Sequence, residues 1–492
     1  MSSVFTYVKD LYRGKYFRDV ILPISILCIG FTWRSFYLEE RDLCLDEPFT
    51  LFHAQKSLLS IIQLSVEGEP NPPLFMLLLH FWIKVGGTEV SFVRLLPLVF
   101  SSLTAVFLYQ TGKRFFSTAT GIIASFLFLF SNFHFFHSIE LRTYSLLSFA
   151  TAATLFYFFR LIKESDRNWI VGVLIFFNLV LVYSHYFGWF VVFMEILSLL
   201  FYLKDKAVVK KIIITIFITF LAYIPFFLVL IRQFLKSSQG TWVEPPGSVN
   251  EYLYQLHNLL NHKEVFNVVI WVIILGAIYA FFRKSWSLLS KEYLILILWW
   301  FVPYTIMFVL SYRIPVFITR YLLFNSIALY LLISVSVFAF FNSHKIIVPV
   351  MGLIILLVMV NRMKILPKDF SYREVKNATN YVIDNKQIGD IVLLYPYWSD
   401  NEFSYYFDRT IFSDPMNLNE RLAQVKVFPV WNQGMAESII KRKHCKRVIY
   451  YLNGPNPDED DAIFCYLKEK FALIECTLYP QTISVSIFEV KQ

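Results

Sequence analysis

Two adjacent carboxylates, Asp46 and Glu47, follow the first long apolar run in the sequence Leu-Asp-Glu-Pro. A carboxylate at a membrane surface can take a proton from an attacking hydroxyl, and low-dielectric surroundings raise its basicity. We therefore predict that Asp46 is a catalytic base and that Glu47 assists it by tuning it or positioning the acceptor. The structural alternative is that Asp46 caps a short helix whose first turn contains Glu47 and Pro48.

Three arginines, Arg94, Arg142 and Arg320, stand at the edges of apolar runs. The guanidinium fork matches phosphate geometry and stays charged in apolar surroundings. Such groups stabilise a phosphate leaving group as its negative charge develops. We predict that they bind a donor phosphate. The alternative is structural pairing, such as Glu140 with Arg142 or with a partner on another helix.

Several other polar residues are predicted to face the same side of the membrane and to bind substrate. Charged groups in or near a membrane are costly and need a partner or a function. Interfacial snorkelling and helix capping are the structural alternative. The predicted substrate-binding residues are Asn71, Glu140, His185 and Arg313.

Two histidines and a glutamate raise the question of a metal. His134, His137 and Glu140 are spaced by three residues, and on a helix their directions spread apart. No further ligands complete a zinc set. We predict no metal site built by the protein alone, while a divalent metal that bridges a donor phosphate and a carboxylate stays open.

The composition indicates a multi-pass α-helical membrane protein. The chain has 492 residues, of which 57% are hydrophobic and 16% charged, and its repeated apolar stretches of about twenty residues can each cross a bilayer. The net charge is +9. Much of the basic charge lies in every second short loop between apolar runs, as the positive-inside rule predicts for cytoplasmic loops. This pattern argues against nucleic-acid binding and puts the basic N-terminus in the cytoplasm.

We predict about eleven transmembrane helices and an extracytoplasmic outer loop over about residues 39–91. Within this loop, residues 73–85 are too short for a crossing and are predicted to form an interfacial or re-entrant helix. Counting that segment as a span would invert the basic-loop pattern downstream. The predicted spans are 19–38, 92–110, 118–136, 144–161, 169–183, 187–203, 212–231, 265–282, 293–310, 321–341 and 346–360.

The transmembrane region is predicted to cover residues 1–361, and residues 362–492 to form a C-terminal extracytoplasmic α/β domain. Helices alternate there with strands at the spacing of a small α/β fold. The predicted elements are a helix at 371–385, a strand at 390–395, a strand at 447–452, a helix at 458–470 and two closing strands. A disulfide among Cys445, Cys465 and Cys476 and free thiols are both open.

The order of the motifs resembles the glycosyltransferase family 39 branch of the GT-C superfamily. That branch includes protein O-mannosyltransferases and the lipid A aminoarabinose transferase. The motifs that carry the resemblance are Asp46-Glu47, Asn71-Pro72-Pro73-Leu74, Arg94-Leu95-Leu96, Gly112-Lys113-Arg114-Phe115-Phe116, Glu140-Leu141-Arg142-Thr143-Tyr144 and Arg320-Tyr321-Leu322-Leu323.

The resemblance implies an inverting transferase whose sugar is carried on a polyprenyl phosphate, acting on the non-cytoplasmic face of the cell (inner) membrane. Asp46 matches the position of the family's catalytic acidic residue, and Arg94 and Arg320 match phosphate-contacting positions. Two positions depart from the pattern: Asn71 stands where His or Lys is common, and Ile139 replaces the first arginine of Arg-Glu-Ala-Arg. The phosphate charge must then be balanced elsewhere.

The expected function is transfer of the sugar to a hydroxyl of a glycolipid, polysaccharide or protein, with no soluble cofactor. A secondary transporter is a rival interpretation, although transporters tend to have repeated halves and polar groups near the midplane, and neither is visible here. A ligase or polymerase of lipid-linked polysaccharide would use the same class of donor. A non-enzymatic assembly or receptor protein is the last interpretation that the sequence leaves open.

Overall fold

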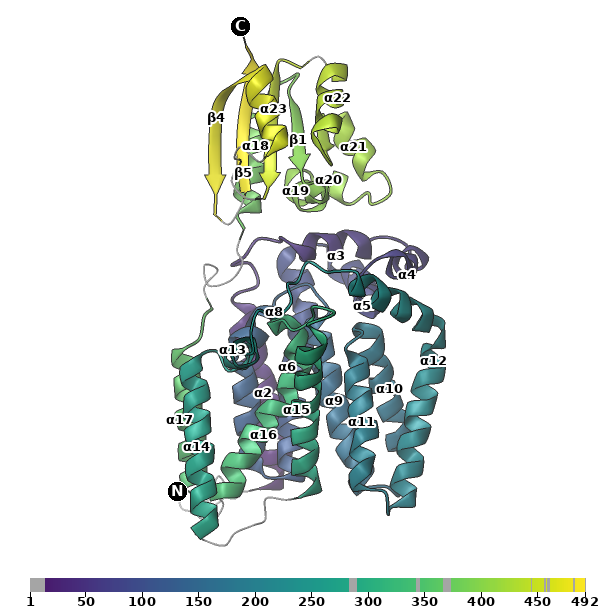
Figure 1. The fold of residues 1–492 in the computed structure, drawn as a ribbon, viewed down its shortest axis with the longest axis vertical. Helices are drawn as coiled ribbons and strands as arrows, with labels where there is room; N and C mark the ends of the chain where they lie inside the picture. Colours follow the sequence, from purple (N-terminus) through teal and green to yellow (C-terminus); the bar gives the residue numbers. More distant parts are fainter. Residues whose placement is uncertain are drawn as a thin grey trace, which may run out of the picture. The chain divides into compact units, whose positions relative to one another are not determined.

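The computed structural model describes residues 14–282, 290–341, 346–365, 373–443, 445–454, 457, 461–480 and 483–491. The chain divides into two compact units, whose elements are labelled in Figure 1. The first, which we call the helical unit, contains Met1–Phe36, Ile62–Phe75 and Arg94–Ile365. The second, which we call the mixed unit, contains Tyr37–Ile61, Met76–Val93 and Leu366–Gln492.

Each of the eleven ranges predicted as spans contains a helix. These helices are α2 (Leu22–Ser35), α6 (Val90–Phe115), α7 (Thr118–Leu129) with α8 (Asn132–Ser138), α9 (Tyr144–Lys163), α10 (Trp169–Ser184), α11 (Gly188–Ser198), α12 (Lys206–Ser238), α14 (Lys263–Phe282), α15 (Lys291–Leu310), α16 (Leu323–Phe341) and α17 (Ile347–Asn361).

By length and apolar character, five of the described helices can cross a membrane, or up to seven if each of two bent pairs is one span. The range 118–136 is one such pair, because α7 and α8 meet at an angle of 66°. The bend follows from local capping: the Ser131 side chain accepts the N–H of His134 and starts a new helix. The count of eleven spans stays a prediction.

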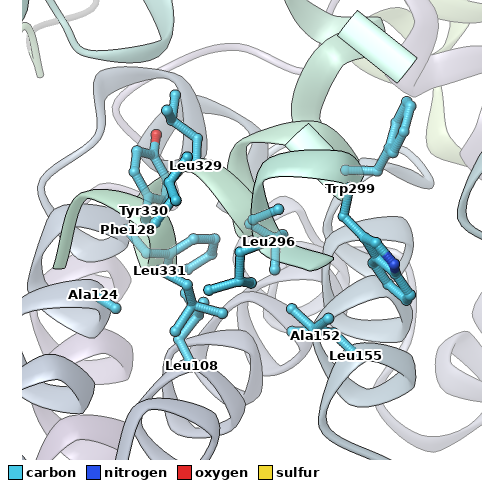
Figure 2. Packing of buried hydrophobic residues seen from close by; sticks show 14 of the residues in the cluster. Leu108, Ala124, Phe128, Ala152, Leu155, Leu296, Trp299, Leu329, Tyr330 and Leu331 are labelled. Atoms are coloured by element: carbon cyan, nitrogen blue, oxygen red, sulfur yellow. The ribbon is translucent and has the colours of Figure 1, made fainter. Parts of the chain in front are cut away.

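The core of the helical unit lies where α16 packs against α7, α9, α14 and α15. Leu108, Phe128, Leu155 and Leu331 are buried there, and Figure 2 shows their side chains close together. Helices α6 and α7 approach closely at two glycines, since a Cβ added at Gly112 would lie 2.4 Å from the backbone of Gly121. Only glycine allows such an approach of two helices.

The mixed unit contains a five-stranded sheet in the order β2-β1-β3-β5-β4. Strands β1 (Ile391–Tyr395), β2 (Val427–Pro429) and β3 (Arg447–Asn453) are parallel, whereas β5 (Ile483–Val490) runs antiparallel to β3 and to β4 (Phe471–Tyr479). Each parallel strand is followed by helices, which Figure 1 shows on the faces of the sheet. The parallel part therefore follows the usual crossover arrangement.

The helices associated with this sheet are α18 (Val375–Asn385), α19 (Asp400–Phe407), α20 (Arg409–Phe412), α21 (Leu418–Gln424), α22 (Gln433–Lys443) and α23 (Ala462–Lys470). The predicted helices at 371–385 and 458–470 are confirmed as α18 and α23, although residues 371–372 and 458–460 lie outside the described residues. The predicted strands correspond to β1, β3, β4 and β5. Strand β2 and helices α19 to α22 were not predicted.

The mixed unit also contains α3 (Asp46–Ala54) and most of α5 (Leu74–Gly86), from the region predicted as an outer loop. Helix α5 confirms that the segment predicted as interfacial is helical. Helix α4 (Leu58–Glu67) lies between α3 and α5 in the sequence, and its residues are divided between the two units. All five cysteines are thiols in the structure, so Cys445, Cys465 and Cys476 form no disulfide with one another.

Candidate active site

The backbone turns sharply immediately before Asp46. Leu45 has φ 60° and ψ −122°, the values of the first central residue of a type II′ turn, and the N–H of Glu47 donates to the Cys44 carbonyl at 3.3 Å. Glycine is the usual residue there, so leucine adds strain of about 1–3 kcal/mol. Strain of this kind persists only where surrounding contacts fix the backbone, and it concentrates at functional sites.

The two adjacent carboxylates lie in different surroundings. Asp46 is exposed at the first residue of α3. Glu47 is 2% exposed and forms an ion pair with Arg41, whose Nη2 lies 3.0 Å from Glu47 Oε2. Leu45, which occupies the N-cap position, makes no side-chain capping bond. Asp46 is the first residue of the helix and is therefore not the N-cap residue that was considered. Of the pair, Asp46 is the carboxylate that a substrate hydroxyl can reach.

The buried ion pair predicts a measurable stability effect. Arg41→Ala leaves Glu47 charged and buried, which is expected to lower the free energy of unfolding by about 3–5 kcal/mol. The measurement is the Tm of purified variants in detergent. The control is the double variant Arg41→Met with Glu47→Leu, which removes both charges and should unfold near the wild-type Tm. An unchanged Tm for Arg41→Ala would show that the pair does not stabilise the fold.

In the helical unit, Glu69 joins two of the predicted site residues. Arg142 Nη2 lies 3.6 Å from Glu69 Oε1, and the Asn71 amide donates to the same oxygen at 3.2 Å. Arg142 and Glu69 are both buried. Glu140, which was considered as a partner of Arg142, hydrogen-bonds His137 through its carboxylate and accepts the Arg142 backbone N–H through its carbonyl at 2.7 Å.

Arg142 and Arg320 approach the same aromatic side chains. Both arginines interact electrostatically with Tyr144 and His185. The ring of His185 lies 6.1 Å from that of Tyr144 and 6.0 Å from that of Tyr321. Residues that are far apart in the sequence are therefore gathered in one cluster, which contains two guanidinium groups and the carboxylates of Glu69 and Glu140.

Arg320 has an aromatic neighbour that was not predicted. Its guanidinium carbon lies 4.5 Å from the centre of the Trp242 ring and 5.5 Å from that of Tyr321. Such contacts hold a guanidinium through its face. Its N–H groups can then still donate hydrogen bonds. Trp242 is 70% exposed and lies in the polar loop after α12. A single tryptophan in a polar loop was the only feature of the sequence that could have indicated this contact.

The remaining predicted residues differ in exposure. Arg94 is fully buried in α6, whereas Arg313 is exposed after α15. Sequence reasoning also missed Arg34, a fully buried arginine near the end of α2 that donates to the Ser101 hydroxyl at 2.5 Å and to the Leu129 carbonyl at 3.0 Å. The feature of the sequence that could have identified Arg34 is its position as a lone charge at the end of an apolar run. Glu69, two residues before Asn71, had no comparable signal.

The two histidines on α8 have separate partners. His134 Nε2 hydrogen-bonds Ser326 Oγ at 2.7 Å, while His137 bonds Glu140. Within the described ranges, no group of three or more His, Cys, Asp or Glu side chains is arranged to hold a metal. A metal that also binds a donor phosphate stays open.

Asp46, Glu47 and Arg41 belong to the mixed unit, and Glu69, Asn71, Arg142 and Arg320 to the helical unit. The structure therefore defines two local arrangements: an exposed carboxylate on a strained turn, and a cluster of arginine, glutamate and aromatic side chains. Their convergence on one pocket stays a prediction.

Sequence comparison gives one family match. Residues 70–231, which include Asn71, Arg94 and Arg142, match the family model described as dolichyl-phosphate-mannose-protein mannosyltransferase. No curated protein matches the chain.

Structure comparison finds similar folds among solved glycosyltransferase structures. ArnT from Cupriavidus metallidurans in the apo state has a TM-score of 0.61 at 10% identity, over 95% of this chain and 97% of ArnT. ArnT bound to undecaprenyl phosphate has a TM-score of 0.59 at 11% identity, with the same coverage. The archaeal oligosaccharyltransferase AglB from Archaeoglobus fulgidus, in complex with an inhibitory peptide and a dolichol-phosphate, has a TM-score of 0.50 at 12% identity, over 89% of this chain and 70% of AglB.

At these identities the likeness to solved structures concerns the fold. Together with the family match, it confirms the resemblance to GT-C glycosyltransferases of the ArnT and protein mannosyltransferase kind. The fold agrees with the coarser part of the predicted class, a helical region with several apolar helices followed by a small α/β region.

Proposed function

We propose that this chain is an inverting membrane glycosyltransferase that moves a sugar from a polyprenyl-phosphate donor to a hydroxyl acceptor on the extracytoplasmic side. The acceptor is a glycolipid, polysaccharide or protein. The fold shared with ArnT and the family match over residues 70–231 support this class of reaction. In this proposal the N-terminus is cytoplasmic and the α/β region extracytoplasmic.

The observation that carries the proposal is the contrast between the adjacent carboxylates. Asp46 is exposed, and in the proposed reaction it takes the proton of the acceptor hydroxyl. The acceptor oxygen then bonds to the anomeric carbon from the face opposite the phosphate. Glu47, neutralised by Arg41, holds the first turn of α3 in place, so that it assists the base without itself accepting the proton.

The cationic residues are proposed to hold the departing lipid phosphate. As the bond between the anomeric carbon and the phosphate oxygen breaks, negative charge develops on the phosphate, and Arg142 and Arg320 are suited to stabilise it. Arg94, which lies on α6 and is fully buried, is proposed as a third contact of the phosphate. Asn71, Glu140, His185 and Arg313 remain proposed substrate contacts, with Asn71 acting through its bond to Glu69.

The direct test uses the full-length purified chain in lipid nanodiscs with radiolabelled sugars on polyprenyl phosphate. We expect labelled product and an equal amount of free polyprenyl phosphate, and no turnover of the corresponding nucleotide sugars. A panel of hexose and pentose donors with glycolipid, glycan and peptide acceptors is needed, because neither partner is fixed by the residues.

The same preparation distinguishes the alternative class. In sealed proteoliposomes, solute uptake that needs no lipid-linked donor would contradict the transferase proposal and favour a transporter. Cysteine-accessibility labelling in intact cells tests the orientation separately: a cysteine introduced at exposed Glu40 is expected to react with an impermeant reagent added from outside the inner membrane.

A further inference from the structure

The segment that leads to Asp46 is attached to the C-terminal α/β region by two hydrogen bonds and one electrostatic contact within the mixed unit. Asp42 Oδ2 accepts the backbone N–H of Lys376 at 2.8 Å. The N–H of Leu43 donates to the Tyr406 hydroxyl at 2.6 Å, and the backbone of Leu45 interacts with the Glu402 carboxyl and lowers its pKa. These contacts hold successive points of the turn that places Asp46.

The contact at Asp42 completes the N-terminus of a helix. Glu374 is the N-cap residue of α18, but it makes no side-chain capping bond. Asp42, which comes from the loop, instead accepts an N–H of the first turn of α18, where a carboxylate also interacts favourably with the helix dipole. The loop and the helix therefore fix one another.

Glu402 is held in a buried polar chain. It is 4% exposed and accepts the side-chain amide of Asn453, whose carbonyl oxygen in turn accepts from Arg373. Asn453 ends β3, and Glu402 lies on α19. A buried carboxyl with this many fixed partners is positioned rigidly, and one of its partners is the strained backbone at Leu45.

We propose that the C-terminal α/β region is the positioning element of the catalytic turn, with Glu402 and Tyr406 holding residues 42–45 so that Asp46 is directed at the acceptor. This inference rests on the proposed role of Asp46 as the base. Glu402 and Tyr406 are positioning residues, because they bind the backbone of the turn and are not proposed to touch substrate. A misplacement of about 1 Å can reduce turnover by about 10²-fold.

The charge state of Glu402 provides a readout that is specific to positioning. Burial raises the pKa of Glu402 to about 7, with Asp400 adding to the increase and Arg373, the Leu45 backbone and Asn453 opposing it. The phenol of Tyr451 also faces the carboxyl. The ionised form of Glu402 is favoured both by the Asn453 amide, which donates to it, and by the backbone of Leu45. Protonation weakens both contacts, so we expect kcat to fall as pH falls through about 7.

Stability should change in the opposite direction. The folded pKa of about 7 is higher than the ordinary value of 4.5, so the native state binds this proton more tightly than the unfolded chain does. The contribution of Glu402 to the free energy of unfolding is therefore greatest below the ordinary pKa of 4.5. It is lost as the pH rises from there through the folded pKa of about 7. With rising pH, a positioning role of Glu402 predicts that kcat increases while the free energy of unfolding decreases. A residue that only stabilised the fold would not produce these opposite changes.

The test compares Glu402→Gln, Tyr406→Phe and the matched control Tyr405→Phe in the full-length chain. The Tyr405 hydroxyl donates to the Thr88 carbonyl at 3.0 Å. We expect kcat to fall by about 10-fold to 10²-fold in both positioning variants with little change in the donor KM. Glu402→Gln should also lose the pH limb near 7 in kcat, and Tyr405→Phe should retain wild-type turnover.

The outcomes separate this inference from the proposed function. If Asp46→Asn abolishes transfer while both positioning variants keep wild-type kcat and pH profile, the positioning role is wrong and the base remains. If Asp46→Asn transfers normally, the base itself is wrong. If Glu402→Gln does not fold, Tyr406→Phe decides the question, because it removes one hydroxyl from a partly buried ring; unchanged kcat in that variant overturns the inference.

Discussion

Asp46→Asn is expected to lower kcat by about 10²-fold to 10⁴-fold, the usual contribution of a general base. Asparagine has nearly the same shape but cannot take the acceptor proton at neutral pH. Asp46 is exposed and the substituted side chain has nearly the same volume, so the Tm should change little. The measurement is turnover with saturating labelled donor, together with donor binding.

The matched control for this prediction is Glu40→Gln, which neutralises another exposed carboxylate of the same loop. It should turn over at the wild-type rate. Donor affinity should be retained in Asp46→Asn, because the lost group acts on the acceptor. Wild-type turnover by a folded Asp46→Asn protein would contradict the proposed base, and equal losses in both variants would indicate a general effect of loop charge.

Arg142→Lys is expected to reduce kcat/KM for the donor by about 10²-fold, comparable to the loss of one donor that stabilises developing negative charge. Lysine keeps the positive charge and can still pair with buried Glu69, which lies 3.6 Å from the guanidinium. It cannot reproduce the two parallel N–H groups that fit a phosphate. The Tm should therefore change little while donor use falls.

Arg362→Lys is the control, because Arg362 forms a partly exposed ion pair with Glu264 in the same unit. That variant should retain both donor use and stability. The structural alternative predicts the reverse pattern for Arg142→Lys: full transfer by the fraction that remains folded, with a lower Tm. Steady-state kinetics and a thermal unfolding curve on one preparation decide between the two.

Apolar patterning was enough to predict the helices of the membrane region, because long apolar runs between basic loops restrict the possible structures. It did not predict the bend between α7 and α8, which depends on the capping bond from the N–H of His134 to Ser131. Strand β2, Val427–Pro429, was missed because three residues are too few to show an alternation.

The residues of the candidate site were named from the sequence and their roles stay predictions, but their pairings were not predicted. Arg142 was considered with Glu140, three residues from His137, yet the structure also brings it to Glu69. Partners of buried charges are chosen by tertiary packing between distant segments, so sequence spacing carries little information about them. The left-handed backbone of Leu45 was equally hidden, because leucine is an unusual residue for such a turn.

The discontinuity of the mixed unit has a consequence for biogenesis. Asp42 and its partner Lys376 are separated by 334 positions, and the sheet is complete only once β5, Ile483–Val490, has been synthesised. A ribosome thus releases the loop long before its support exists, and contacts of such long range form late in folding. A nascent chain that stops before β5 would carry the proposed base without this support, so the proposed activity would be acquired only after β5 has been synthesised.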